Sequence, residues 1–193
     1  TALSDSGYIR KNIDGKYEIG VKIFTISQTN SIWKSLVQNI SPLLEYISQK
    51  FKVAASLYAY TDDEITVIDR VYHPDNIAMR KIGDAKKDYL LSPWGYLYLY
   101  NLPDERRDIY IGKQIEESGN SLLLPSEYEI EDILRFIQNN GYADDNGRFM
   151  PSVRRIAFPI YSQGHLLAAL GIGSFVNLID ESTIAEIADT IKN

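Results

Sequence analysis

The stretch GYADDNGRFMPSVRRIAFPIYSQGHLLAALGIGS, residues 141–174, decides the fold of this chain. Runs of β-branched and aromatic residues alternate in it with turn-forming runs, so strands are predicted at 141–145, 154–161 and 166–174. The run Asp144-Asp145-Asn146-Gly147 ends the first strand, and the polar residues 162–165 with their glycine join the other two as a hairpin. We therefore expect a β-meander near the end of the chain.

The same stretch carries a candidate binding site. Neighbouring strand residues point to opposite faces of a sheet, so Arg154 and Arg155 are expected to face opposite sides. Gly171 and Gly173 lie two apart and leave one face without side chains. An arginine and Asp145 above such a hollow suit a small anion or polar molecule. The alternative is an exposed arginine pair, a solvated turn and glycines that accommodate a packed helix.

Composition limits the class of protein. The chain has 193 residues, of which 45% are hydrophobic and 24% charged, so it can bury a core and holds one full domain with a small appendage. The absence of cysteine excludes disulfides and thiolate nucleophiles and fits a cytoplasmic protein, and two histidines leave few metal ligands. No apolar run approaches the roughly 20 residues that cross a bilayer. The formal charge of −6 repels the phosphate backbone of nucleic acid, so any contact with nucleic acid must come from a local group of cationic residues.

Upstream of the meander, the chain begins with a predicted helix end stopped at Gly7 and a hairpin turning at Asp14-Gly15. A helix end and one hairpin do not fold independently, so we expect them to belong to a domain whose front precedes them. A short linker helix at 20–28 follows, and then two helices within 32–51, the second beginning at Pro42. A hairpin at 53–73 and a short strand at 77–82 come next.

An aromatic segment and three further helices complete the predicted elements. Ser92 as N-cap and Pro93 at the first helical position predict a helix over 94–101, crowded with tryptophan and tyrosine. A charged helix is expected at 104–114, one after the capping box Ser126-Glu127-Tyr128-Glu129, and a last one after Asp180. The sequence therefore predicts an α+β fold with a central antiparallel sheet flanked by helices.

These motifs together resemble one protein family. The pattern G-Y-x-x-D, then V-R-x-I-A-x-P-I, a short hairpin and L-A-A-L-x-I-x-S is similar to the effector-binding domain of IclR-type bacterial transcription regulators. The resemblance extends upstream through Asp69-Arg70-Val71 and Ile82-Gly83 to the segment 14–20, which looks like that family's wing and the start of its linker helix. It covers most of the chain, with the motifs in the same order and spacing.

The resemblance implies a domain organisation and a set of roles. Residues 1–20 would be the end of a winged helix-turn-helix with its wing, 21–31 a linker helix, and 32–193 a GAF-like effector-binding domain. Arg10, Lys11 and Lys16 would contact DNA phosphates, with an ordinary solvated hairpin face as the alternative. The positions that match the family's effector pocket are Met79, Tyr89, Ser92, Trp94, Asp145, Arg155, Gly171 and Gly173.

At one point the sequence departs from that family's pattern. The helix that starts at Pro93 usually begins with small residues whose amides face the ligand, whereas proline has no amide proton and Trp94 is large. We therefore expect an aromatic wall for a flat or bulky ligand, with Arg155 as the charged anchor. The alternative is that these aromatic residues form core or dimer contacts.

The function expected from these observations is that of a ligand-responsive regulator. It would bind an organic acid or aromatic effector and double-stranded operator DNA, as a homodimer or homotetramer, with no cofactor, no metal and no membrane contact. Two alternatives remain open at this stage: an enzyme that uses Asp145 and Arg155 on a bound substrate, and a module that serves only dimerisation. The enzyme is disfavoured because the sequence has no cysteine, no G-x-S-x-G elbow and no phosphate-binding glycine loop.

Overall fold

The computed structural model describes residues 1–20, 22–23, 32–61, 64–77, 80–118 and 124–192, which fall into two compact units, Thr1–Gln38 and Asn39–Asn193. In the first unit, helix α1 (Ala2–Asp5) ends before Gly7, whose positive φ of 76° is easy for glycine. Strands β1 (Ile9–Lys11) and β2 (Tyr17–Ile19) pair antiparallel around the Asp14-Gly15 turn, as predicted. The predicted linker helix at 20–28 falls largely on residue 21 and residues 24–31, which lie outside the described residues.

The second unit is built on a six-stranded sheet in which every pairing is antiparallel. Its order is β5-β4-β3-β8-β7-β6. The strands are β3 (Ala54–Thr61), β4 (Glu64–Val71), β5 (Ala85–Lys86), β6 (Ala143–Asp144), β7 (Val153–Ser162) and β8 (His165–Phe175). The meander β6-β7-β8 is the predicted one, and its register places Arg155 opposite Gly173.

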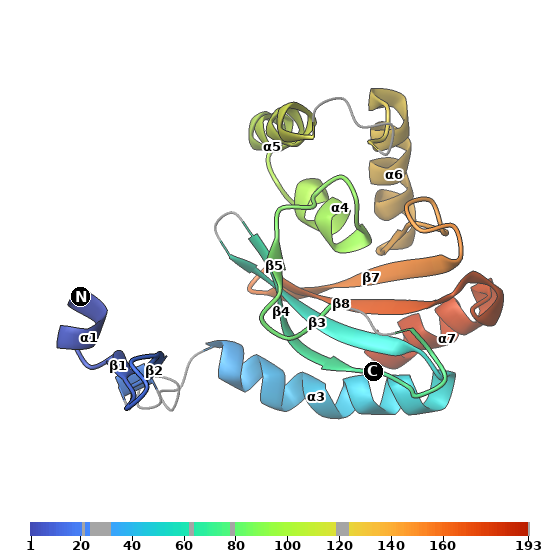
Figure 1. The fold of residues 1–193 in the computed structure, drawn as a ribbon. Coiled ribbons are helices and arrows are strands. Elements are labelled where there is room, and N and C mark those ends of the chain that lie inside the picture. Colours follow the sequence, from blue (N-terminus) through green and yellow to red (C-terminus); the bar gives the residue numbers. More distant parts are fainter. Residues whose placement is uncertain (21, 24–31, 62–63, 78–79, 119–123, 193) are drawn as a thin grey trace. The chain divides into compact units, whose positions relative to one another are not determined.

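Helices cover both faces of this sheet (Figure 1), which is the predicted α+β arrangement. One face carries α7 (Glu181–Lys192) and α3 (Ile32–Phe51), and an ion pair of 2.6 Å joins Lys50 of α3 to Glu186 of α7. The other face carries α4 (Pro93–Tyr100), with α5 (Asp104–Glu117) and α6 (Glu127–Asn140) beside it. A short 3-10 turn, η1 (Val176–Leu178), follows β8. No helix among the described residues is long and apolar enough to span a bilayer.

The prediction of two helices within 32–51 was wrong, because α3 runs through Pro42 without a break. Proline removes one backbone donor from the helix, but every other residue of the neighbouring turns keeps its own N–H. After Pro42 the helix is anchored by the buried side chains of Leu44 and Ile47, and the Ser48 hydroxyl donates to the carbonyl oxygen of Val53. The burial of these side chains therefore stabilises a continuous helix despite the proline.

The predicted strand at 77–82 was also wrong. Residues 77 and 80–82, the described part of that segment, are loop and turn, and the edge strand β5 begins only at Ala85. The backbone here pairs with β4 through single contacts: Gly83 N–H donates to Val67 O, and Val67 N–H donates to Asp84 O. The Arg70 guanidinium also donates to the carbonyl oxygen of Arg80, at 2.9 Å. Isolated backbone hydrogen bonds and one side-chain contact therefore stand in place of a strand ladder.

The predicted helix caps are confirmed. Ser92 accepts a hydrogen bond from the backbone N–H of Gly95 at the start of α4, and Ser126 and Glu129 form the reciprocal capping box of α6. Gly141, with a φ of 77°, ends α6 in the left-handed conformation. Caps depend on residues that are close in sequence, and for this reason the sequence predicts them.

The cap of α7 leads to a prediction about pH. The Asp180 carboxylate accepts the backbone N–H of Thr183 at 2.8 Å and the Ser182 and Thr183 hydroxyls, and these bonds lower the pKa of Asp180 from 3.8 to about 2. Since the pKa is lower in the folded protein than in the unfolded chain, this contribution to stability is complete above pH 3.8 and is lost as pH falls toward about 2. Asp180→Asn keeps a cap acceptor without the titration.

We therefore expect the stability advantage of the wild type over Asp180→Asn to shrink as pH falls from about 4 to about 2. Urea unfolding of both proteins at a series of pH values measures it. A difference that stays constant across that window would contradict the role given to the Asp180 carboxylate.

Candidate functional site

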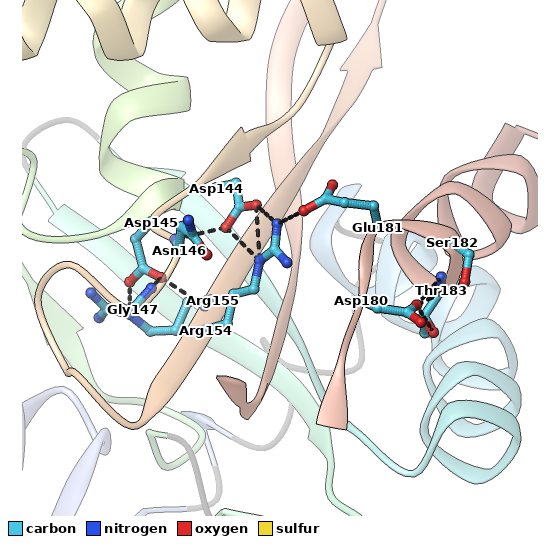
Figure 2. Close-up of polar contacts among 10 residues, drawn as sticks. All are labelled: Asp144, Asp145, Asn146, Gly147, Arg154, Arg155, Asp180, Glu181, Ser182 and Thr183. Carbon is cyan, nitrogen blue, oxygen red and sulfur yellow. Dashed lines mark hydrogen bonds and ion pairs between the residues drawn. The ribbon is translucent and has the colours of Figure 1, made fainter. Parts of the chain in front are cut away.

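The two adjacent arginines of β7 face opposite sides of the sheet, as predicted (Figure 2). On the α7 side, the Nε of Arg154 donates to both carboxylate oxygens of Asp144, at 3.2 and 3.0 Å, and its NH2 lies 2.6 Å from Glu181 Oε1. Arg154 therefore ties β6 and the start of α7 to β7. Its role on this face is structural.

On the α4 side, Arg155 pairs with Asp145, and both residues are less than a tenth exposed. Arg155 Nε lies 2.5 Å from Asp145 Oδ2, its backbone N–H donates to Asp145 Oδ1 at 2.8 Å, and its NH2 donates to Leu91 O at 2.9 Å. Burial raises the pKa of the Asp145 carboxyl, and the charge and hydrogen bonds of Arg155, with the N–H of Gly147, oppose that rise. The guanidinium is thus fixed against the segment that leads into α4.

A cavity of about 590 Å³ opens beside Arg155, within the size range of small-molecule sites. It lies between the loop after β4, the segment before α4 and the start of β7. Its lining residues are Ile77, Arg80, Lys86, Asp88, Leu91, Trp94, Met150, Val153 and Arg155. Three cationic side chains and one carboxylate therefore surround a partly apolar space.

Trp94 forms the aromatic side of this cavity. Its ring stacks on Tyr58 with 4.1 Å between centroids and 13° between planes. The guanidinium carbons of Arg155 and Arg80 lie 5.4 and 5.5 Å from the Trp94 centroid, which is within cation–π range. The indole therefore lies among one aromatic ring and two cations.

Of the residues predicted to line an effector pocket, two line this cavity: Trp94 and Arg155. Asp145 pairs with Arg155 but does not line the cavity. Ser92 is fully buried as the cap of α4. Tyr89 lines a separate cavity of about 200 Å³ with Tyr110, Lys113 and Gln114. Met79 lies outside the described residues, although Ile77 and Arg80 on either side of it line the larger cavity.

The hollow predicted above the β8 glycines is filled at Gly171. A Cβ placed there would lie 2.5 Å from Tyr58 Cε2 and 3.3 Å from Trp94 Cε3. Gly171 therefore makes room for the stacked aromatic pair rather than for open space. Gly173 pairs with Ala54 and Arg155 in the neighbouring strands. The cavity lies beside the aromatic pair instead of above the glycines.

Sequence reasoning missed the polar residues that surround Trp94. Among the described residues, five buried side-chain atoms have no hydrogen-bond partner: Ser56 Oγ, Tyr58 Oη, Arg80 NH1, Asp88 Oδ1 and Trp94 Nε1. Leaving such an atom unpaired costs about 1–3 kcal/mol, so native proteins keep few of them. Ser56 and Tyr58 lie on one face of β3 by the alternation of strand residues, but nothing in the sequence connects them to Arg80 or Asp88.

The lining of the cavity supplies groups for binding a polar molecule. Its lining offers cations, one carboxylate, an indole and apolar side chains, and neither histidine of the chain is among the lining residues. Within the described residues no group of three histidine, cysteine, aspartate or glutamate side chains is placed to hold a metal ion. These groups can bind and orient a polar molecule.

The fold and the cavity together define an α+β domain with a cavity of small-molecule size, preceded by a small hairpin unit. The family model described as the C-terminal domain of the bacterial transcriptional regulator IclR matches residues 33–193. The chain belongs to this family of transcriptional regulators.

Solved structures of the same family share the fold at low sequence identity. An IclR homologue from Microbacterium hydrocarbonoxydans, complexed with 4-hydroxybenzoate, matches with a TM-score of 0.81 and 19% identity over 98% of this chain and 78% of its own. The IclR of Thermotoga maritima matches with a TM-score of 0.72 and 20% identity over 99% and 78%. A regulator from Brucella abortus gives a TM-score of 0.69 and 20% identity over 99% and 75%. No curated protein sequence matches the chain.

Proposed function

We propose that this chain senses a small organic or aromatic acid in the cavity beside Trp94 and Arg155 and passes its occupancy to an operator-binding unit. The observation that carries this proposal is a cavity of ligand size lined by Trp94, Arg155 and two further cations. Family membership makes transcription the process that such a sensor controls. The 4-hydroxybenzoate bound to the Microbacterium homologue supports an aromatic acid as effector.

In this proposal the site residues divide into contacting and supporting groups. Arg155 and Trp94 touch the effector. The contact expected of Met79 concerns a residue outside the described part of the chain. Asp145 holds the Arg155 guanidinium in place, so little conformational entropy is lost when the ligand binds. Tyr89, Ser92, Gly171 and Gly173 act indirectly, by fixing α4 and the aromatic pair against the sheet.

The effector site is tested by removing one buried ion pair at a time. Alanine at 155 alone would leave the Asp145 carboxylate buried without its partner, so the test variant replaces both residues, Asp145→Leu with Arg155→Met. The control replaces the pair on the other face, Asp144→Leu with Arg154→Met. Calorimetry with 4-hydroxybenzoate and a panel of organic acids should show binding to the wild type and the control.

Affinity should fall at least about tenfold in the Asp145/Arg155 variant, because the lost guanidinium contact is charge-assisted. Equal affinity in both double variants would reject Arg155 as the anchor. A panel that gives no binding and no rise in melting temperature would favour a module that serves only dimerisation.

We further propose that residues 1–20 form the wing of a winged helix-turn-helix, that 21–31 link it to the effector domain, and that the domain spans 32–193. Arg10, Lys11 and Lys16 would meet DNA phosphates from the β1-β2 hairpin. Arg10 already faces Glu18 across the hairpin at 3.3 Å, and Lys11 lies over the Tyr17 ring, so Lys16 is the cation with the weakest internal competition of the three. In a homodimer or homotetramer, effector binding would alter the spacing of two such units.

Lys16→Ala is expected to weaken binding to DNA of any sequence and to reduce the slope of log K against log salt by about one. Fluorescence anisotropy with a short labelled duplex at several salt concentrations measures both quantities. Lys50→Ala, which removes a lysine that pairs with Glu186 on α7, is the control and should leave the slope unchanged. An unchanged slope for Lys16→Ala would remove this residue from the interface.

A further inference from the structure

Three cationic side chains line the cavity, and two of them already face a carboxylate. Arg80 contacts Asp88, and Arg155 contacts Asp145. The charges within each pair cancel, so each pair attracts a charged ligand only weakly. Lys86 is the third cation of the lining, and within the described part of the chain no carboxylate forms an ion pair with it. Lys86 therefore gives the lining its net positive charge.

The sheet places Lys86 on the face that carries α4. In the antiparallel pairing of β5 with β4, Lys86 lies opposite Ile65, and Ile65 lies opposite Tyr60 of β3. Residues that lie opposite each other in a sheet project to the same side. The Tyr60 hydroxyl donates to the carbonyl oxygen of Trp94 at 2.7 Å, which identifies that side as the α4 face. Lys86 is exposed, so a ligand that arrives from solvent can reach its ammonium group.

The lining differs between its buried and its exposed parts. Trp94 and Val153 are 1% and 6% exposed, whereas Lys86 and Met150 are exposed. A flat apolar ring gains most from contact with the buried indole. A charged group loses least hydration when it stays near solvent. An aromatic acid is therefore best placed with its ring toward Trp94 and its carboxylate toward Lys86.

We infer that Lys86 selects the charge of the effector, by pairing with an acid group at the outer end of a ligand whose ring lies against Trp94. This inference rests on the proposed function. Arg155 still donates hydrogen bonds to the ligand, but Asp145 already compensates its charge. An uncharged ligand of the same shape lacks the attraction to Lys86 and binds more weakly. Lys86 is thus a specificity-determining residue on the edge strand β5.

The next residue in the chain provides a matched control. Lys87 is also exposed, but it lines the separate cavity with Tyr89 and Tyr110. Lys86→Met and Lys87→Met therefore remove the same charge from neighbouring positions, and only the first changes the lining of the proposed site. Calorimetry on the wild type and both variants compares benzoate with benzamide, and 4-hydroxybenzoate with 4-hydroxybenzamide.

For at least one of these pairs, the wild type should bind the acid at least about threefold more tightly than the amide. Lys86→Met should abolish this preference by weakening the binding of the acid alone, and Lys87→Met should retain it. Added salt should weaken the binding of the acid more in the wild type than in Lys86→Met, because salt screens the attraction between exposed charges. Lys86→Glu should gain affinity for benzamidine, a cation shaped like benzoate, and Lys87→Glu should not.

Acids that bind Lys86→Met as tightly as the wild type would overturn the inference and leave the proposed sensor standing. Amides that bind the wild type as tightly as their acids would do the same. An equal loss of acid and amide binding in Lys86→Met would also overturn it, because the substitution would then act through the shape of the cavity. If no acid binds the wild type, the proposed sensor and the inference both fail. Should Lys86→Met be unstable, benzamidine binding to Lys86→Glu decides, since unfolding cannot produce a gain of affinity.

Discussion

Replacing Asp145 by alanine is expected to lower the free energy of unfolding by about 3–5 kcal/mol, because the Arg155 guanidinium stays buried without a counter-charge. The Asp145 side chain is 1% exposed and that of Arg155 is 10% exposed, so water replaces the lost partner poorly. Domains of this size have about 5–15 kcal/mol of stability in total, and the variant would therefore be close to unfolding at room temperature. Urea unfolding followed by circular dichroism measures the loss.

The neighbouring pair supplies a matched control. Asp144→Ala also removes a buried carboxylate, but Arg154 keeps its contact with Glu181 at 2.6 Å, so a smaller loss is expected. The double variant Asp145→Leu with Arg155→Met should recover most of the stability, since well-packed apolar residues commonly replace a buried ion pair at little net cost. Equal losses for Asp144→Ala and Asp145→Ala would contradict the view that the missing counter-charge causes the effect.

Local sequence signals predicted much of the fold. The caps at Ser92, Ser126 and Asp180, the meander and the opposite orientation of the two arginines follow from neighbouring residues and from the alternation of strands. Pro42 misled the prediction because the buried face of α3 is a tertiary property that overrides a local break signal. The helices, strands and turns that the sequence resolved best are those whose cause lies within a few residues.

The candidate site was less accessible to sequence reasoning. The sequence predicted Trp94 and Arg155 as site residues. It did not predict Arg80 and Asp88, because single hydrogen bonds to β4 and to the cap of α4 fix the backbone of their segments. The filling of the space above Gly171 depends on the rotamer of Tyr58 on β3, a strand that pairs with β8 in the sheet but lies far from it in the sequence. Packing between elements that are distant in the sequence decides which side chain fills a hollow. Local sequence patterns do not reveal such packing.

Gly95→Ala is the second substitution with a large expected effect, a loss of about 3 kcal/mol or more in the free energy of unfolding. A Cβ at this position would lie 2.5 Å from Tyr89 O, 2.6 Å from Asp88 O and 2.6 Å from Tyr89 Cα. These are backbone atoms, so no side-chain rotation can relieve the overlap. The first turn of α4 would have to move away from the segment that carries Asp88.

That displacement links stability to ligand binding, because Trp94 on α4 and Asp88 before it line the same cavity. We expect Gly95→Ala to weaken effector binding in calorimetry as well as to lower the midpoint of urea unfolding. Gly112→Ala is the matched control: a Cβ there meets nothing within 4 Å, and alanine in the middle of α5 should stabilise the helix by about 0.5–1 kcal/mol. Unchanged stability in Gly95→Ala would mean that α4 does not pack this closely on residues 88 and 89.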